Sequence, residues 1–149
     1  MSASAQVKLA SLEVRELHAS EKPGMAAFFR EAGFPVAILP ADRGWGALSR
    51  ETLVGCIALC QEAKTWVVRG PEVRHGFQKR GTGARLLEAI EPELEGLTCY
   101  CVAYPYLRKM YAKVGLIPCP ASEQPNFLAK RVAWLHRTGW NLTILRRAG

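Results

Sequence analysis

The fold is decided by one stretch of sequence, Val73-Arg-His-Gly-Phe-Gln-Lys-Arg-Gly-Thr-Gly-Ala-Arg-Leu-Leu87, in which a strand leads through a glycine-bearing loop into a helix. The first backbone N–H groups of a helix have no intrahelical acceptors, and the helix dipole adds partial positive charge there. Glycines let a phosphate approach the backbone, and Lys79 and Arg80 add full charges. The stretch therefore predicts an anion site.

Three phosphate-binding signatures compete for this loop, and their spacing separates them. The P-loop pattern requires a lysine where Thr82 stands. The dinucleotide fingerprint requires a third glycine where Leu86 stands. The third pattern, Gln/Arg-x-x-Gly-x-Gly/Ala, is met at every specified position by Gln78-Lys-Arg-Gly-Thr-Gly83. In this loop the sequence resembles the GNAT acyltransferase family.

The chain on either side of the loop resembles the same family. Upstream, residues 53–73 are similar to its two central strands, and the pair Gly70-Pro71 predicts a bulge or a splayed strand because it cannot keep an unbroken ladder. Downstream, Met110-Tyr-Ala-Lys-Val-Gly-Leu116 is similar to a family signature that places a tyrosine before a glycine. The resemblance covers residues 53–117, with a weaker fit at residues 12–33.

Hydrophobic patterning predicts a single α/β domain over residues 1–149. Strands are predicted at residues 12–17, 45–49, 53–60, 65–74, 97–102, 116–118 and 140–145, and helices at residues 20–32, 83–94, 105–114 and 125–138. The resemblance implies a GNAT-type mixed, mostly antiparallel central sheet with two splayed parallel strands, flanked by helices. Pro35 and Pro40 leave room for one helix between the first two strands, where family members commonly have two.

The resemblance implies an N-acetyltransferase that moves an acetyl group from acetyl-CoA, or another acyl group from its CoA thioester, to a primary amine. The CoA would lie where the parallel strands splay, and free backbone groups around Val73 and Arg74 would bind its pantetheine arm and polarise the thioester carbonyl. The amine would attack directly, without a covalent enzyme intermediate. The residues that would cradle the pyrophosphate are Gln78, Lys79, Arg80, Gly81, Thr82 and Gly83.

Tyr111 matches the family's tyrosine that protonates, or hydrogen-bonds, the departing CoA thiolate. A phenol with a pKa of about 10 is protonated at neutral pH and can stabilise a developing thiolate. Helical spacing alone favours a buried aromatic side chain on the apolar face of a helix. The interval between Tyr111 and Gly115 favours the catalytic interpretation.

The sequence does not identify which residue acts as the general base. The acidic position that many family members carry on the first splayed strand falls near Trp66 or Val67, so it does not transfer. Glu62, Glu72 and His75 are the remaining candidates. Further arginines that could neutralise CoA phosphates, or simply be solvated, are Arg69, Arg74 and Arg85.

The net charge of +7 suggests an anionic partner, but its distribution matters more. Residues 1–95 contain 12 basic and 12 acidic side chains, whereas residues 96–149 contain 8 basic side chains and one acid, Glu123. A nucleic-acid-binding protein is one alternative function, with Trp134 and Trp140 as stacking surfaces. We favour a solvated basic rim, because these charges lie on segments with apolar faces; beside the acceptor cleft, such a rim would favour an acidic acceptor.

A non-catalytic acyl-CoA sensor is a second possible function class. As an enzyme, the protein would take a small molecule or a peptide amine as its acceptor. The sequence leaves open whether the protein forms a homodimer. The five cysteines (Cys56, Cys60, Cys99, Cys101 and Cys119) predict reduced, apolar packing residues in the cytoplasm rather than metal ligands. Residues 1–6 lack the charged start of an export signal, and the longest apolar run, residues 53–60, is too short to span a bilayer.

Overall fold

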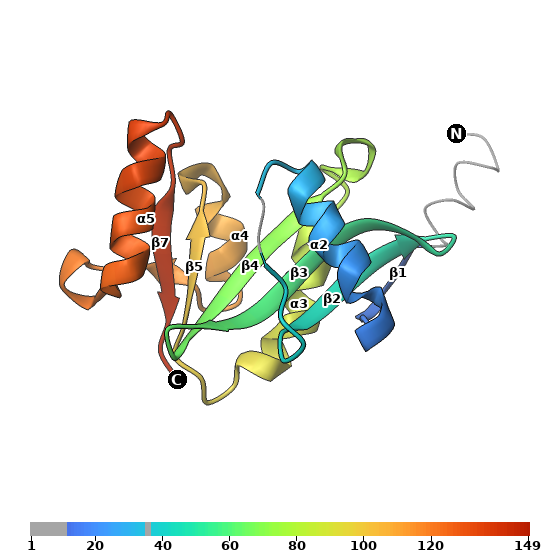
Figure 1. Ribbon diagram of the computed structural model, residues 1–149, viewed down its shortest axis with the longest axis horizontal. Coiled ribbons are helices and arrows are strands. Elements are labelled where there is room, and N and C mark those ends of the chain that lie inside the picture. The colour runs from blue at the N-terminus through green and yellow to red at the C-terminus, as the bar shows by residue number, and fades with distance from the viewer. Residues whose placement is uncertain (1–11, 35–36) are drawn as a thin grey trace.

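The computed structural model describes residues 12–34 and 37–149, whose centre is a seven-stranded sheet (Figure 1). The strands are β1 (Leu12–Glu16), β2 (Arg43–Ser49), β3 (Thr52–Glu62), β4 (Thr65–Val73), β5 (Cys99–Ala103), β6 (Ile117–Pro118) and β7 (Thr143–Arg147). They lie in the order β1-β2-β3-β4-β5-β7-β6. β4 and β5 are parallel, and the other neighbouring strands are antiparallel. The predicted mixed, mostly antiparallel sheet is confirmed.

Four α-helices connect the strands within the described part of the chain. They are α2 (Lys22–Glu31), α3 (Thr82–Ile90), α4 (Arg108–Ala112) and α5 (Asn126–Arg137). Short 3-10 turns flank them at η1 (Ala19–Glu21), η2 (His75–Phe77), η3 (Glu91–Leu94), η4 (Pro105–Leu107) and η5 (Ala121–Glu123). The predicted order of elements is confirmed.

Several element ends differ from the predictions. The helix expected at residues 83–94 tightens into η3 because Pro92 lacks an N–H group and its ring clashes with the preceding turn. The helix expected at residues 105–114 is divided between η4 and α4. The last strand begins at Thr143, so Trp140 lies in the connection before it. The expectations for residues 1–6 and for Pro35 fall outside the described residues.

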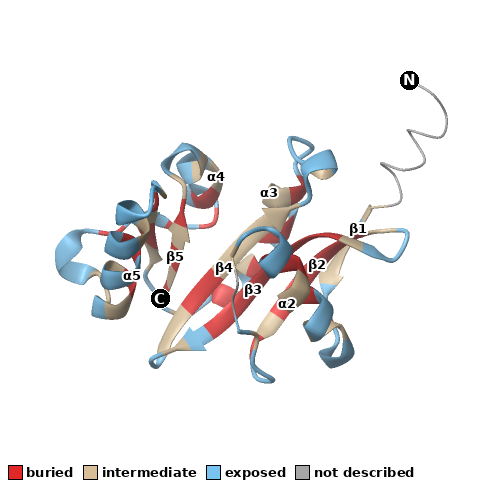
Figure 2. Ribbon diagram, turned by 45° about the horizontal axis from the view of Figure 1, so that its top comes forward, coloured by how far each residue is buried: buried red, intermediate tan, exposed pale blue. Residues whose placement is uncertain are grey.

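Helices cover both faces of the sheet, and the buried positions concentrate in its central strands (Figure 2). On one face, Leu86 of α3 packs in a cluster with Ile57 of β3. On the opposite face, Phe29 of α2 packs in a cluster with Ala58, the next residue of β3, and α5 packs there through Leu128. Successive residues of β3 thus enter opposite clusters, which confirms that the apolar run is covered on both faces.

The parallel pair diverges towards its carboxyl ends. β4 pairs with β5 only from Trp66 to Val68, opposite Cys99 to Cys101. β4 then continues to Val73 and β5 to Ala103 without further pairing between their described residues. The predicted splay is therefore present, and it follows immediately after Val68.

The predicted bulge lies at the start of this divergence. Ala58 of β3 pairs with Arg69, but Cys56 pairs with Glu72, so β4 holds one more residue than β3 in this interval. Gly70 has a φ of 91°, and a Cβ atom there would lie 2.9 Å from the carbonyl oxygen of Cys56. Both the positive φ and the close backbone approach require glycine. The peptide bond between Gly70 and Pro71 is cis.

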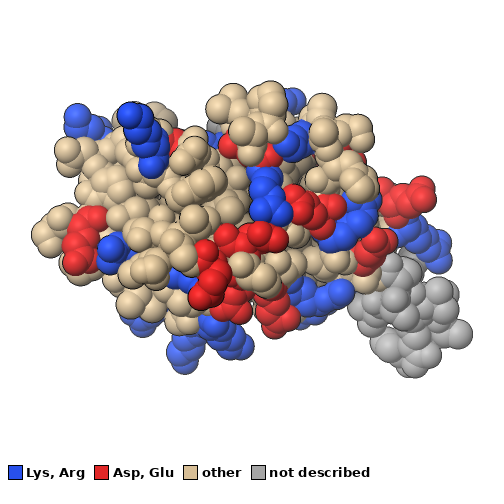
Figure 3. All heavy atoms as spheres, turned by 90° about the horizontal axis from the view of Figure 1, so that it is seen from below, with Lys and Arg blue, Asp and Glu red and all other residues tan. Residues whose placement is uncertain are grey.

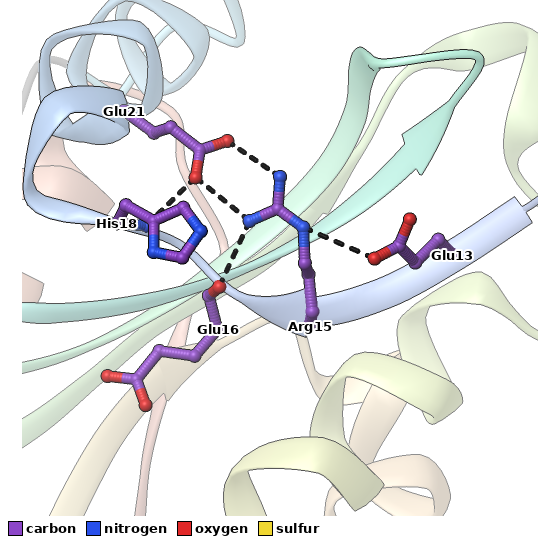
Figure 4. Close-up of polar contacts among 5 residues, drawn as sticks. All are labelled: Glu13, Arg15, Glu16, His18 and Glu21. Carbon is purple, nitrogen blue, oxygen red and sulfur yellow. Dashed lines mark hydrogen bonds and ion pairs between the residues drawn. The ribbon is translucent and has the colours of Figure 1, made fainter.

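Charged side chains fix the turn from β1 into α2 (Figure 4). The Arg15 guanidinium donates to the two carboxylate oxygens of Glu21 at 2.8 and 3.1 Å, and it lies 3.3 Å from Glu13. Glu21 also accepts a hydrogen bond of 2.9 Å from the His18 amide. The bonds from Arg15 and His18 lower the pKa of Glu21 to about 2. The network orients the chain as it enters α2.

The surface mixes both signs of charge. Figure 3 shows Lys and Arg interspersed with Asp and Glu across one face. Each described helix is too short or too polar to span a bilayer. Among residues 12–34 and 37–149, no three His, Cys, Asp or Glu side chains gather in a metal-binding cluster.

Candidate active site

A cleft of about 710 Å³ opens where β4 and β5 diverge. Its walls come from both faces of the sheet: the start of α3 and Met110 of α4 lie on one face, and Phe29 of α2 and Leu135 of α5 lie on the other. The cleft therefore passes through the sheet between the splayed strands. A smaller hollow of about 310 Å³ adjoins it and shares Glu72, Val73 and Gln78.

The predicted anion loop forms one end of the cleft. Gly81 is the N-cap of α3 with a φ of 77°, a conformation that favours glycine. The first intrahelical bond runs from the Arg85 amide to the Gly81 carbonyl at 3.0 Å, so the amides of residues 82–84 precede it and lack intrahelical acceptors. The Thr82 hydroxyl donates to the Phe77 carbonyl at 3.2 Å and fixes the loop from within. The predicted loop residues that line the cleft are Gln78, Lys79, Gly81, Thr82 and Gly83.

The predicted backbone contacts need one correction. The Arg74 amide donates to the Val54 carbonyl at 2.7 Å, and its carbonyl accepts from the Phe77 amide at 2.8 Å, so neither group is free for pantetheine. Because hydrogen-bonding groups alternate along a strand, the N–H and C=O of Val73 point away from β3 towards the cleft. The Val73 carbonyl accepts from Gln78 Nε2 at 2.9 Å. The expectation of free groups is wrong for Arg74, and for the Val73 N–H it stays a prediction.

Three predicted cations lie beside the cleft rather than in its wall. The Arg80 guanidinium lies 5.7 Å from the centre of the Phe77 ring. The Arg74 guanidinium lies 5.7 Å from the centre of the Phe28 ring and lines the smaller hollow. Arg85 is exposed on α3. Their charges can add to the local potential without direct contact with the cleft.

Tyr111 reaches the bulge from α4. Its side chain is 3% exposed and packs in the cluster on the α3 face, while its hydroxyl donates to the Gly70 carbonyl at 3.0 Å. Burial raises the pKa of this phenol well above its usual value near 10. The two interpretations of Tyr111 are thus compatible: its ring belongs to the core, and its hydroxyl lies at the strand break in the cleft wall.

Cys101 lies in the same corner, a position that no pattern in the sequence indicates. Its thiol donates to the Gly70 carbonyl at 3.7 Å. Burial raises the pKa of this thiol to about 12, so it stays protonated at neutral pH and is a poor nucleophile. All five cysteines are buried and unpaired, as predicted.

The bulge turns Glu72 towards the face that carries α2 and α5. Side chains alternate along a strand, so residues 69 and 72 of a regular β4 would point to opposite faces. With the extra residue between them, Arg69 pairs with Ala58 and Glu72 with Cys56, which both belong to the cluster on the α2 face. Glu72 lines the cleft, and burial raises the pKa of its carboxyl to about 7.

Glu62, the other carboxylate candidate, has a different environment. It lies 3.1 Å from Arg69 and 2.8 Å from Arg131. Although burial opposes the shift, these two cations lower the pKa of Glu62. Within residues 12–34 and 37–149, Glu72 forms no such ion pair. Glu62 therefore stays ionised and engaged, whereas Glu72 can exchange a proton near neutral pH. His75 lies exposed on η2, beside the smaller hollow.

Four aromatic side chains cluster in the wall of the cleft. The ring centres of Phe34 and Trp140 lie 5.1 Å apart, and those of Tyr104 and Trp140 lie 6.5 Å apart. Tyr104 also stacks on Tyr106, with ring centres 5.5 Å apart. All four residues line the cleft. Phe34, Tyr104 and Trp140 lie in connections between elements, where neither helical nor strand periodicity gives a signal, and Tyr106 lies in η4.

Three of the eight basic side chains after residue 95 form ion pairs in the described structure, two of them with acidic side chains from earlier in the chain. Arg147 lies 3.6 Å from Glu91 and 3.3 Å from Glu95, and Arg131 binds Glu62. Arg146 lies 3.5 Å from Glu123. These pairings favour the solvated rim over a continuous surface for nucleic acid. Arg131 also lines the cleft.

Solved structures with the same fold include one that holds coenzyme A and one described as an acyl-CoA N-acyltransferase. N-acetylglutamate synthase from Neisseria gonorrhoeae, solved with coenzyme A and N-acetyl-glutamate, is 22% identical with a TM-score of 0.63, over 91% of this chain and 34% of that protein. This chain thus spans about a third of the synthase. An acyl-CoA N-acyltransferase from Pseudomonas aeruginosa is 16% identical with a TM-score of 0.62, over 93% of this chain and 100% of that one. These likenesses concern the fold.

The sequence itself identifies the family. No curated protein matches the chain significantly. A family model described as the acetyltransferase (GNAT) family matches residues 8–116, which include the strand break, the anion loop and Tyr111. This match covers well over half of the chain, so the chain belongs to the acetyltransferase (GNAT) family.

Proposed function

We propose that the chain acts as one acyltransferase domain that transfers the acetyl group of acetyl-CoA to a primary amine. The observation that carries this proposal is the continuous cleft that joins the anion loop to the strand break beside Gly70, Glu72 and Tyr111. The five unpaired thiols support a cytoplasmic location.

The chain fits the cofactor along the length of the cleft. The amides of residues 82–84 and the side chain of Lys79 would hold the pyrophosphate at the start of α3. The Val73 N–H would bind the pantetheine arm, while the bond from Gln78 fixes the Val73 carbonyl in the same wall. Acetyl-CoA supplies the activated thioester, which would lie near Gly70. The role of the protein is then to hold that carbonyl and the amine together.

Glu72 is the general base in this proposal. A free primary amine is an ammonium ion at neutral pH and must lose protons before and during attack. A carboxyl whose pKa is raised to about 7 is a stronger base than an ordinary glutamate and is still substantially ionised at neutral pH. The bulge places Glu72 on the face opposite α3, from which the acceptor can approach without crossing the anion loop.

Tyr111 is the group that stabilises the departing thiolate. Its hydroxyl already donates to Gly70 at the strand break, and a rotation about its C–O bond would redirect the proton to a sulfur in the cleft. Because burial raises its pKa well above 10, the phenol keeps its proton throughout the neutral range. The proton that Glu72 receives and the hydrogen bond that Tyr111 donates act at opposite sides of the reacting carbonyl.

A screen of primary amines with acetyl-CoA, monitored by the appearance of free thiol, tests this proposal. We expect amine-dependent thiol release together with an acetylated amine identified by mass spectrometry. Saturable acetyl-CoA binding without transfer to any amine would instead support a non-catalytic acyl-CoA sensor.

A further inference from the structure

We infer that the acceptor is a small amine that carries a carboxylate, as an amino acid does, rather than a polypeptide. This inference rests on the proposed function and specifies the substrate of the same cleft. Two features carry it. Both lie in the part of the cleft on the sheet face that carries α2 and α5, which we call the acceptor end. They are an ion cluster with a surplus positive charge and contacts that bridge the cleft walls.

The ion cluster consists of Arg69, Glu62 and Arg131. Glu62 lies 3.1 Å from Arg69 and 2.8 Å from Arg131, so one carboxylate faces two guanidinium groups. The Arg69 and Glu62 side chains are 16% and 17% exposed, which limits screening by water. Both arginines line the cleft. Within the cluster two cations face one anion, so it carries a net charge of +1.

The arginines retain donors for a ligand. A guanidinium has five N–H groups. Arg131 directs Nη1 and Nη2 towards Glu62, while Arg69 directs Nη2 towards Glu62 and Nη1 towards the Ala37 carbonyl at 3.0 Å. These contacts engage only part of each donor set. The side chain of Arg131 is 42% exposed, so its remaining N–H groups are accessible to a carboxylate, the anion whose geometry a guanidinium matches best.

The same region restricts the size of the acceptor. The bond from Arg69 to Ala37 ties the segment before β2 to β4, and Glu62 ties α5 to the same place through Arg131. The contact between Phe34 and Trp140 joins the segment after α2 to the segment after α5. Since α2 and α5 stand on either side of the splay on the same face (Figure 1), these contacts bridge the cleft from wall to wall. An extended peptide would require an open groove here.

The remaining groups suit the other end of a zwitterion. The aromatic faces of Tyr104 and Trp140 attract an ammonium group, and Glu72 can accept its proton. A ligand that places its amine near Glu72 and its carboxylate near Arg131 uses the aromatic faces, the carboxyl of Glu72 and the arginine cluster together. A short amino acid with an apolar or aromatic side chain has this chemistry.

The test compares matched acceptors on the full-length protein. L-leucine and L-phenylalanine are each assayed against their carboxamides, their decarboxylated amines and dipeptides that begin with the same residue. We expect kcat/KM for at least one free amino acid to exceed that of its amide and its decarboxylated amine by about tenfold or more. Equal kcat/KM for acids and amides, or preferred acetylation of the dipeptides, would overturn the inference.

Variants on α5 identify the group that binds the carboxylate. Arg131→Met should lower kcat/KM for the amino acid about tenfold more than kcat/KM for its amide, and it should leave acetyl-CoA affinity intact. Arg131→Lys should restore part of the loss, and Lys130→Met, an exposed neighbour on the same helix, should have no effect. An equal loss with acid and amide would mean that Arg131 only fastens α5 to β3, and the inference would fall.

These outcomes separate the inference from the proposed function. Transfer to amines with no preference for a carboxylate contradicts the inference but supports the proposed acetyltransferase activity. If the protein transfers acetyl to none of the amines tested, including the amides and decarboxylated amines, the proposed function is contradicted and the inference falls with it.

Discussion

The phenolic oxygen of Tyr111 lies 3.0 Å from the carbonyl oxygen of Gly70 and donates a hydrogen bond to it. The two residues come from α4 and from the bulge in β4, elements far apart in the sequence. The bond fixes the tyrosine hydroxyl at the point where the parallel strands separate. Substitutions of the groups around that point should therefore affect both activity and stability.

Replacing Tyr111 by Phe removes the hydroxyl and keeps the ring in the core. We expect kcat to fall about a hundredfold, because the departing thiolate loses its hydrogen-bond donor, while acetyl-CoA affinity stays within a factor of about two. Urea unfolding should show a loss of about 1 kcal/mol from the Gly70 hydrogen bond. An unchanged kcat would assign Tyr111 to the core alone.

Replacing Gly70 by Ala tests the bulge. The positive φ and the 2.9 Å approach to the Cys56 carbonyl should together cost about 3 kcal/mol of unfolding free energy, measured by urea denaturation. Gly76→Ala is the matched control, because an added Cβ would meet no atom within 4 Å; it should change stability by less than about 0.5 kcal/mol. Similar losses in the two variants would contradict the account of the bulge.

Replacing Glu72 by Gln should lower kcat about a hundredfold and alter the pH dependence of kcat/KM. In the native protein the base must be ionised, so kcat/KM should rise with pH through an apparent pKa of about 7. The Gln variant should lack this limb. Persistence of the limb in the variant would assign the titration to another group.

Glu72 also affects how stability depends on pH. The folded pKa is raised above the unfolded value of 4.5, so the folded state binds more protons between these values and its stability should fall as pH rises from about 4.5 to about 7. Above pH 7 the contribution is constant. Urea titrations across this range should show a shallower decline for Glu72→Gln, which should be the more stable protein at pH 8. A steeper decline of stability for Glu72→Gln than for the native protein would contradict the raised pKa of Glu72.

Cys101 should not carry the acetyl group, although its thiol shares the corner with Tyr111. Burial raises the pKa of the thiol to about 12, which leaves almost no thiolate at neutral pH. Intact-protein mass spectrometry after mixing with acetyl-CoA should therefore find no acetyl-enzyme at pH 7. Stoichiometric acetylation of Cys101 on the time scale of turnover would require a two-step mechanism.

The parts of the site that the sequence could predict are local. The anion loop is a contiguous run whose glycines and cations act through nearby backbone, and Tyr111 stands at a fixed interval from Gly115. The same holds for the break at Gly70-Pro71, since proline removes a ladder donor wherever it stands in a strand. The structure retains all three features.

The parts that the sequence could not predict depend on distant pairing. Strand alternation alone places residues 69 and 72 on opposite faces, and only the register with Ala58 and Cys56 shows that both point to the acceptor side. The contact of Phe34 with Trp140 joins two connections that have no periodicity to read. Whether Glu62 is a base or an ion-pair partner likewise depends on Arg131, 69 residues later.

Calorimetric titration of the protein with acetyl-CoA is the sharpest check on the proposed cofactor cleft, because the cleft, the loop and the strand break must all be formed for binding. We expect saturable one-site binding, with about 2.7 kcal/mol of added stability against unfolding at a hundredfold excess over Kd. The absence of saturable binding at millimolar acetyl-CoA would contradict the proposed cofactor cleft.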